Sequence, residues 1–310
     1  MRRDAARGRV LTGPAQEPHI GRGIALILAT TVCFSTLDAL SKATNPYLPV
    51  NEMLWGRYMF HAIALALLMG PRMKLDLVRT AHPGIQVLRA LMLLASSMLF
   101  VSALVLLPLA EAAALSFVAP LVLTALSVPL LGEKVRPSQW IAVAVGFIGV
   151  LVLVRPGGNL FDVATLLPIG CAFTYALFQI ITRKYAGRDS AYTTHFWTAT
   201  VCTIVLSFTL PFFWKMPTLW GWTALVLMGL IGGIGHFILI KAYECAPPST
   251  LAPFSYAQLI WATLLSWLVF NHLPDAGSML GMAIIVSSGL FAVWMQRRNM
   301  RTEEEGIATD

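Results

Sequence analysis

The sequence has very few charged residues for its length. Only 12% of its 310 residues are Asp, Glu, Lys or Arg, whereas a water-soluble domain carries roughly 25%. The chain also contains no GxxxxGK[ST] phosphate loop, no HExxH, no GxSxG and no CxxC. These absences argue against direct use of ATP and against an enzyme with a known motif.

The cysteines are few and do not have the spacing of metal ligands. Cys33, Cys171, Cys202 and Cys245 lie within or at the ends of apolar stretches. Free cysteine in such places packs as a small apolar residue. We therefore expect no metal site and no cofactor.

Long apolar stretches are what the chain has in abundance. Hydrophobic residues make up 57% of it. Ten stretches come near the ~20 residues that cross a hydrocarbon core. They are continuously apolar, which predicts helices and not the alternating strands of a barrel. The predicted spans of this all-α membrane protein are 21–43, 50–70, 84–107, 109–131, 137–154, 163–182, 192–213, 221–243, 248–270 and 277–296.

The second five spans repeat the order of the first five. The clearest similarity joins residues 107–131 (LPLAEAAALSFVAPLVLTALSVPLL) and 246–270 (APPSTLAPFSYAQLIWATLLSWLVF), and it aligns Phe117 with Tyr256. Five crossings end on the side of the membrane opposite to their start, so the second copy is inverted. Two inverted five-helix repeats around a midplane cavity are typical of alternating-access carriers.

The basic residues predict the orientation. With the N-terminus in the cytoplasm, 17 Lys and Arg fall on the cytoplasmic side and 3 on the outer side. The positive-inside rule favours this arrangement, with both termini in the cytoplasm of a cell with an inner membrane. Anionic membrane lipids then account for the net charge of +7, and no nucleic-acid partner is expected.

Several short motifs point to one family. They include RALMLL at 89–94, GFIGVLVLVRPG at 146–157, GGIGHFILIKAY at 232–243 and FSYAQLIWATLLSWLVF at 254–270. Their order and spacing resemble EamA-type members of the drug/metabolite transporter superfamily. The resemblance implies ten helices, a central cavity and movement of small organic solutes. It divides the chain into a basic cytoplasmic tail at 1–21, a first repeat at 22–155, a second repeat at 163–296 and a cytoplasmic tail at 297–310.

Two ionisable residues in the first two spans are candidates for a gate or charge pair. Asp38 and Arg57 have depths that agree within about one turn, at ~1.5 Å per residue. A charge in the bilayer is costly unless it is paired or hydrated. The pair is therefore either a structural clamp between the two helices or a gate that contacts a substrate charge. Asp38 is also a candidate proton carrier.

Three further polar residues are substrate-binding candidates. Arg89 lies a little over one turn into the third span, where it either reaches back to the interface or faces the cavity and attracts anions. His236 lies near the middle of the eighth span, and a shift of 139 residues places it on Ser97. Polar residues at mid-depth in both repeats are expected of a shared site. His236 is either a packing residue or a proton carrier, because imidazole titrates near neutral pH.

Aromatic and amide side chains complete the predicted site. Gln258 and Trp261 share a helix face with three-residue spacing, with Tyr256 nearby, and Tyr175 and Gln179 share a face with four-residue spacing. Such a lining favours a planar or amphipathic solute. Each aromatic taken alone is also consistent with plain packing.

Prolines interrupt the fourth and ninth spans. Pro108 and Pro247 correspond in the two repeats, whereas Pro120 and Pro253 do not. Proline permits a helix to bend, and corresponding breaks in two repeats mark a transport site. We expect these two helices to be the moving elements.

The sequence predicts a secondary-active or facilitative transporter of a small organic metabolite, working by alternating access and driven by the solute gradient or by protons. Within the family, solutes range from amino acids and their derivatives to riboflavin and S-adenosylmethionine. A lipid-handling flippase or a membrane enzyme with the same cavity is the competing class. A scaffold or multidrug-resistance accessory subunit is a third. The natural substrate, the direction of transport, the coupling ion and the oligomeric state stay open at this point.

Overall fold

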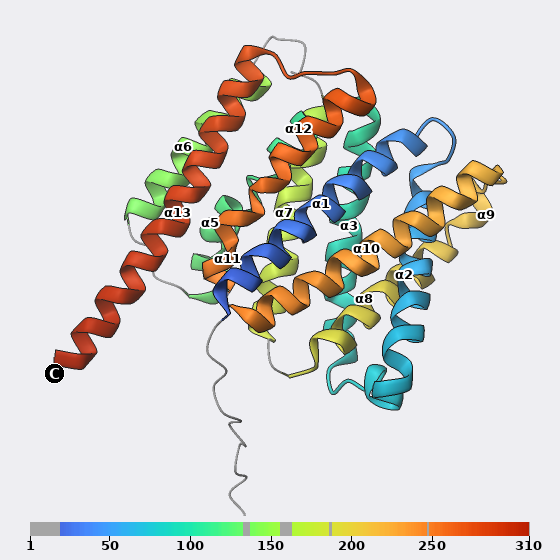
Figure 1. Cartoon of the computed structure of the whole chain (residues 1–310), viewed down its shortest axis with the longest axis horizontal. Helices are drawn as coiled ribbons and strands as arrows, with labels where there is room; N and C mark the ends of the chain where they lie inside the picture. Colours follow the sequence, from blue (N-terminus) through green and yellow to red (C-terminus); the bar gives the residue numbers. More distant parts are fainter. Residues whose placement is uncertain (1–18, 133–136, 156–162, 186–187, 247, 310) are drawn as a thin grey trace, which may run out of the picture.

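The computed structural model describes residues 19–132, 137–155, 163–185, 188–246 and 248–309. Within these ranges the chain is helical and contains no strand (Figure 1). Nine helical segments are long and apolar enough to cross a membrane, and the shorter apolar helix at Gln139–Val154 is the tenth. The predicted all-α membrane fold is thus confirmed. Most of the predicted basic tail, and Pro247, lie outside the described residues.

The helices of the first half follow the predicted spans. They are α1 (Ile20–Thr44), α2 (Val50–Met73) with the short helix η1 (Lys74–Leu77), α3 (Pro83–Leu106), α4 (Leu109–Ser116), α5 (Ala119–Leu131) and α6 (Pro137–Val154).

The second half repeats this series. It contains η2 (Val163–Thr165), α7 (Leu166–Lys184), α8 (Ala191–Ser207), α9 (Leu210–Phe213), α10 (Leu219–Cys245), α11 (Pro248–Ser255), α12 (Ala257–Phe270) and α13 (Ala276–Thr309).

Local sequence explains where several helices begin and end. The hydroxyls of Ser190 and Thr218 accept hydrogen bonds from backbone amides in the first turns of α8 and α10, as N-cap residues do. Helix α5 ends at Gly132 (φ 68°) and α12 at Asn271 (φ 51°), both left-handed. Glycine and asparagine are the residues that tolerate this backbone best. The two halves therefore end their fourth span in the same way with different residues.

The fourth span of each half is broken at the same place. The first break, between α4 and α5, contains Phe117, and the second, between α11 and α12, contains Tyr256. These are the two residues that the repeats align. Pro120 lies in the first turn of α5, just after the first break, whereas Pro253 lies inside α11, just before the second. Each proline weakens the helix within about one turn of the break, so equivalent breaks arise from prolines that do not align.

The two halves interleave instead of packing as separate units. All of the most extensive contacts between helices join one half to the other. In one bundle α1 packs against α10, α11 and α12, with α2 against α10. In its counterpart α7 packs against α3, α4 and α5, with α8 against α3. We call these the α1 bundle (α1, α2, α10, α11, α12) and the α7 bundle (α3, α4, α5, α7, α8).

Helices α6 and α13 pack side by side at one edge of the molecule, and α2, α8 and α9 lie at the opposite edge (Figure 1). Glycines on both helices permit the close approach of α6 and α13. A Cβ atom at Gly149 would meet Ile285 at 2.9 Å, and one at Gly281 would meet Leu153 at 2.7 Å. Small residues at such contacts are typical of helix packing in lipid.

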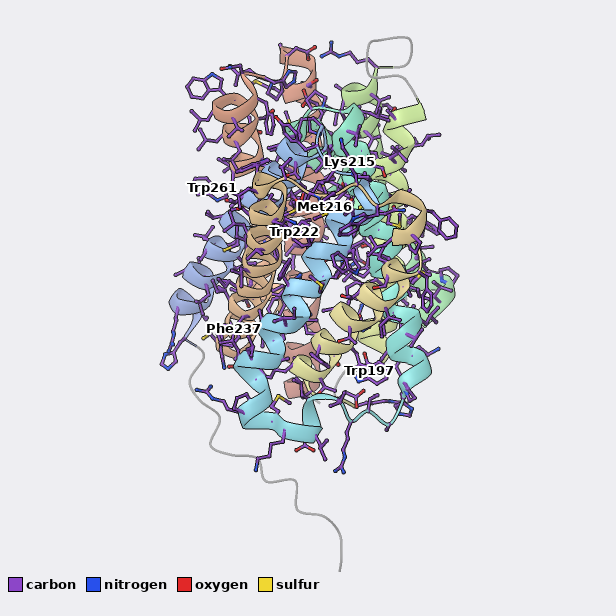
Figure 2. The ribbon with its side chains drawn as sticks, turned by 90° about the vertical axis from the view of Figure 1, so that its right-hand side faces the viewer. Trp197, Lys215, Met216, Trp222, Phe237 and Trp261 are labelled. Atoms are coloured by element: carbon purple, nitrogen blue, oxygen red, sulfur yellow. The ribbon has the colours of Figure 1, made fainter. Side chains whose placement is uncertain are left out.

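The outward surface of the bundle is apolar, as a lipid-facing surface should be. Leu219 and Phe212, for example, expose 86% and 80% of their surface. We call the end where α1 begins the near end and the end where α1 and α12 finish the far end. Trp222 and Lys215 lie toward the far end and Trp197 toward the near end (Figure 2). The indole of Trp197 donates a hydrogen bond to the carbonyl of Val78, at 2.9 Å.

Candidate transport site

Asp38 lies inside the α1 bundle and is held by α12. It exposes only 8% of its surface. Gln258 donates a hydrogen bond from Nε2 to Oδ2 of Asp38 at 3.2 Å, and Ser35 donates to the backbone carbonyl of Gln258 at 3.0 Å. The amide of Gln258 thus contacts one of the few intramembrane carboxylates.

Arg57 lies within electrostatic range of Asp38, but no ion pair within 4 Å joins them. Among the described residues, its guanidinium has no hydrogen-bond acceptor; its only cation–π contact is with the neighbouring ring of Tyr58, at 5.7 Å. Space for the side chain comes from Gly232 on α10, where a Cβ atom would lie 4.0 Å from Nε of Arg57. Five guanidinium donors without an acceptor can bind an anionic group.

Three histidines meet beside Arg57. His61 (α2), His195 (α8) and His236 (α10) have ring centroids 4.9, 5.6 and 4.3 Å apart, and Phe34 lies 4.8 Å from the ring of His236. We call these three the histidine triad. In the described part of the chain, no group of three or more His, Cys, Asp or Glu is arranged to hold a metal ion. Of the three, only His236 is a candidate site residue on sequence grounds.

The predicted pair, Tyr175 and Gln179, lies on α7. Tyr175 exposes 38% of its surface. Its ring stacks on Phe178 at 5.7 Å. Gln179, one turn away, is half-buried. Neither the Tyr175 hydroxyl nor the Gln179 amide bonds to another residue in the described ranges, so both are available to a solute.

Arg89, by contrast, already donates hydrogen bonds within the protein. It is 6% exposed and donates from Nη2 to the carbonyl of Thr194 and the hydroxyl of Thr198, each at 2.5 Å. Its guanidinium also lies over the ring of Phe178, 5.2 Å from the centroid. These contacts join α3, α7 and α8 within one bundle. A solute at Arg89 would have to compete with them.

Ser97 joins the two bundles. Its hydroxyl lies 2.7 Å from the hydroxyl of Tyr58 on α2, and it is half-buried at mid-depth in α3. One of these two hydroxyls donates to the other, so each keeps capacity for a further hydrogen bond.

The two helix breaks face each other. The rings of Phe117 and Tyr256 have centroids 5.2 Å apart. The Tyr256 hydroxyl is buried without a partner in the described part of the structure, and it lies against Gly289 of α13, where an added Cβ would collide with it. The indole N–H of Trp261, one turn beyond the second break, is also buried with no acceptor among the described residues. Both aromatics therefore pack the break, and each keeps an unused donor.

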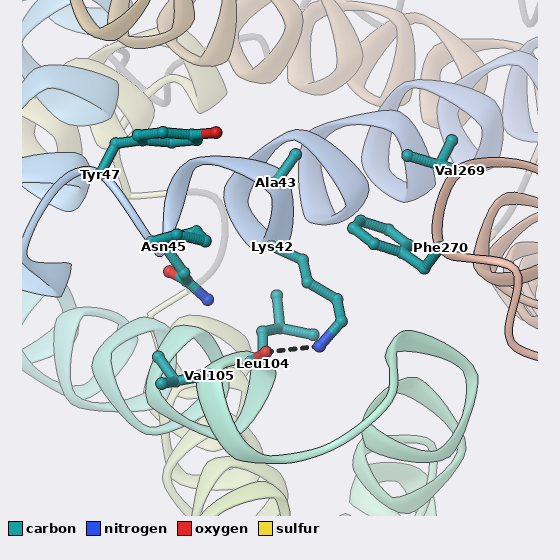
Figure 3. Close-up of a pocket in the computed structure, with 9 residues that line it drawn as sticks. Lys42, Ala43, Asn45, Tyr47, Leu104, Val105, Val269 and Phe270 are labelled. Atoms are coloured by element: carbon teal, nitrogen blue, oxygen red, sulfur yellow. Dashed lines mark hydrogen bonds between the residues drawn. The ribbon is translucent and has the colours of Figure 1, made fainter.

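At the far end, polar contacts join the two bundles. Lys42 at the end of α1 donates to the carbonyls of Leu104 and Leu107, each at 2.7 Å. His272 after α12 pairs with Glu111 of α4 at 2.9 Å. Lys42 also borders a pocket of about 490 Å³ (Figure 3). It is lined by Lys42, Ala43, Asn45, Pro46, Tyr47, Leu104, Val105, Val269 and Phe270.

Two acidic residues outside the spans have lowered pKa values. Asp189 at the near end is partly buried, which raises its pKa, but hydrogen bonds from Thr80 and Gln86 lower it below the ordinary value. Asp275 at the far end accepts a hydrogen bond from the backbone of Ser278 and pairs with Arg155. Together these contacts lower the pKa of Asp275 to about 2.

Comparisons with known proteins agree with this arrangement. The model of the EamA-like transporter family matches residues 21–155 and 163–294, one copy for each half. The chain belongs to the EamA-like transporter family. This result confirms the resemblance found in the motifs and the class of multi-pass membrane transporters.

Two relatives and one solved structure align with most of this EamA-like chain. A Rickettsia prowazekii protein named S-adenosylmethionine uptake transporter is 28% identical over 91% of this chain and 96% of its own length. A Vibrio cholerae protein named riboflavin transporter is 32% identical over 73% of this chain and 76% of its own length. A crystal structure with 23% identity covers 90% of this chain and 98% of its own, with a TM-score of 0.63. That structure supports the fold alone.

Proposed function

We propose that this EamA-family member carries a zwitterionic amino-acid derivative with a planar aromatic part, such as S-adenosylmethionine, across the inner membrane by alternating access. The near end, where the basic residues gather, would face the cytoplasm. The observation that carries the proposal is that Asp38 and Arg57 lie near each other without an ion pair between them, and that Arg57 has no acceptor among the described residues.

The charges match the two ends of an amino-acid group. Asp38 accepts one amide hydrogen bond from Gln258 and has oxygen lone pairs left for an ammonium group. Arg57 has donors for a carboxylate. On α7, Tyr175 and Gln179 have no hydrogen-bond partner among the described residues and would supply an aromatic wall with an amide beside it, which suits a planar heterocycle. The name of the Rickettsia relative agrees with a solute that has both parts.

The packing favours a particular motion. Because the α1 and α7 bundles each contain helices from both repeats, a movement of one whole repeat against the other would break nearly every large contact. A movement of one bundle against the other breaks fewer. We propose that the bundles rock about the facing breaks at Phe117 and Tyr256, and that the contacts of Lys42 and His272 close the far end in the present state.

Uptake of labelled S-adenosylmethionine into proteoliposomes tests the function. We expect saturable uptake, and we expect unlabelled S-adenosylmethionine and its amino-acid fragments to inhibit it. The variants Asp38→Asn and Arg57→Gln should each reduce uptake at least tenfold. Thr203→Ala is the matched control, since its hydroxyl bonds only within α8.

Three outcomes would contradict the proposal. Inhibition by riboflavin but not by amino acids would exclude the zwitterionic group as the recognised feature. Lipid scrambling without solute uptake would favour a flippase. Uptake by Asp38→Asn equal to that of the unmodified protein would exclude this carboxylate from the site.

A further inference from the structure

All three histidines that lie inside membrane-spanning helices are in contact with one another. The chain has six histidines. His19 and His82 cap the starts of α1 and α3, and His272 follows α12. The remaining three form the histidine triad, with His61 and His236 stacked at an interplanar angle of 11° and His195 edge-on to both.

The triad is polar but incompletely hydrogen-bonded. Nε2 of His61 and Nε2 of His195 are buried without a partner in the described part of the chain, and His61 is only 4% exposed. An unpartnered buried nitrogen is costly. A proton satisfies such a group, because a protonated imidazole donates from both nitrogens while a neutral neighbour accepts.

The triad joins the two bundles. His61 and His236 belong to the α1 bundle, whereas His195 belongs to the α7 bundle. A rocking motion of the bundles therefore changes the distance between His195 and the other two rings. A proton shared among them favours the arrangement that keeps the rings together, and its release favours separation.

The charges around the triad are positive. Arg57 of α2 acts on His61 and His236, and Arg89 of α3 acts on His195. Helix α1 presents Phe34, and Cys33 lies nearby. Farther along α10, toward the near end, Lys241 is paired with Glu244, and Tyr192 of α8 donates to that same carboxylate.

These positive neighbours oppose an added proton until an anionic group enters. A carboxylate bound at Arg57 compensates for that charge. By linkage, binding of the carboxylate then raises the affinity for the proton, and binding of the proton raises the affinity for the carboxylate by the same factor.

We propose that the histidine triad binds one proton together with the carboxylate of the solute, so that the protein is a proton–solute symporter. The inference rests on the proposed function and assigns its driving ion. The proton enters from the solution on one side and leaves to the other, and no covalent bond of the solute changes.

The experiment separates exchange from accumulation. Labelled S-adenosylmethionine is added outside proteoliposomes whose membrane potential is clamped at zero. The exchange assay has no pH gradient and has unlabelled solute inside the vesicles. The accumulation assay has a pH gradient of one unit and no solute inside. Exchange requires only a working carrier. Accumulation requires coupling, and a one-to-one symporter concentrates the solute about tenfold for each pH unit.

We expect the unmodified protein to accumulate the solute tenfold. The variant His195→Gln, whose amide cannot be protonated, should not accumulate the solute, while its exchange activity should fall by no more than about threefold. His61→Asn gives a second test if His195→Gln does not fold. His82→Asn, outside the triad, is the control and should accumulate like the unmodified protein. A pH-sensitive dye inside the vesicles should report proton entry with the solute.

Three results would overturn the inference. Exchange without accumulation by the unmodified protein would mean that no proton is coupled, and the proposed function would survive. Tenfold accumulation by both triad variants would place the proton elsewhere. Absence of exchange by the unmodified protein would refute the proposed function and this inference with it.

Discussion

The two bundles have related backbones but different chemistry. The α1 bundle holds Asp38 and Arg57, which interact without an ion pair within 4 Å, and the amide of Gln258. The α7 bundle holds Tyr175 and Gln179, and its one intramembrane arginine, Arg89, donates from Nη2 to two threonine oxygens. Inverted repeats thus preserve the helix packing while the polar side chains diverge.

The difference indicates a division of labour. Charge recognition would belong to the α1 bundle and recognition of an aromatic group to the α7 bundle. The groups that span both bundles are Phe117 with Tyr256, Ser97 with Tyr58, and the histidine triad. A solute that bridges the bundles therefore contacts both kinds of surface.

The strongest test compares the two intramembrane arginines. We expect Arg57→Ala to weaken solute binding about 100-fold, because loss of one partner of a buried charge contact costs roughly 2–5 kcal/mol. Arg89→Gln should instead lower the melting temperature in detergent and leave affinity within about threefold, since Arg89 bonds only to protein. Binding and thermal unfolding measured on both variants decide the matter. A larger loss of affinity for Arg89→Gln than for Arg57→Ala would assign charge recognition to the α7 bundle.

Gln258→Ala should have the next largest effect. Its amide donates to Asp38, and a hydrogen bond to a charged group contributes roughly 1.5–3 kcal/mol. We expect at least a tenfold loss of uptake at limiting solute, with folding retained. Thr263→Ala on the same helix is the control, since its hydroxyl bonds only to Leu259 of its own helix. Equal uptake by both variants would remove Gln258 from the site.

A smaller effect is expected at the second helix break. Gly289→Ala places a methyl group against the hydroxyl and ring of Tyr256, and overpacking typically costs 1–3 kcal/mol. We expect turnover to fall severalfold, with KM nearly unchanged, because the break and not the binding surface is disturbed. Gly70→Ala, with open space around it, should have no such effect. A change in KM alone would show that Tyr256 contacts the solute.

The smallest effect belongs to the far-end ion pair of Arg155 and Asp275. The pKa of Asp275 in the folded protein is about 2, below the usual ~3.9. Its stabilising contribution is therefore fully present above about pH 4 and is lost as the pH falls through 2. Asp275→Asn should lower the melting temperature slightly, by the same amount at pH 6 and pH 8. A difference between these two pH values would contradict the assignment.

Several features were predictable because they depend on composition and periodicity. The ten helices follow from apolar stretches of membrane length, and the inversion follows from five crossings in each repeat. The correspondence of Phe117 with Tyr256 was visible as an alignment, although the contact of their rings was not. The common position of the two breaks was not, because Pro120 and Pro253 do not align and only the structure places both within one turn of the same point.

Contacts between distant helices could not be predicted. His195 gave a usable signal, since it is one of only three histidines in apolar spans, but its contact with His61 and His236 depends on how α2, α8 and α10 pack. The partners of Arg89 come from α8, more than 100 residues away. The grouping of the helices into bundles that mix the repeats was likewise absent from the sequence pattern.

The glycine contacts between α6 and α13 bear on how such a carrier is anchored. Helices that meet in lipid are held by close atomic contact and not by expelled water, so the glycine contacts do not depend on salt or protons, whereas the Arg155–Asp275 pair at the far end of the two helices does. Under the proposed cycle α6 and α13 form a fixed spine. Helix α5 packs on α6, and α4, α5 and α11 pack on α13, so these surfaces would slide along the spine as the pore changes sides.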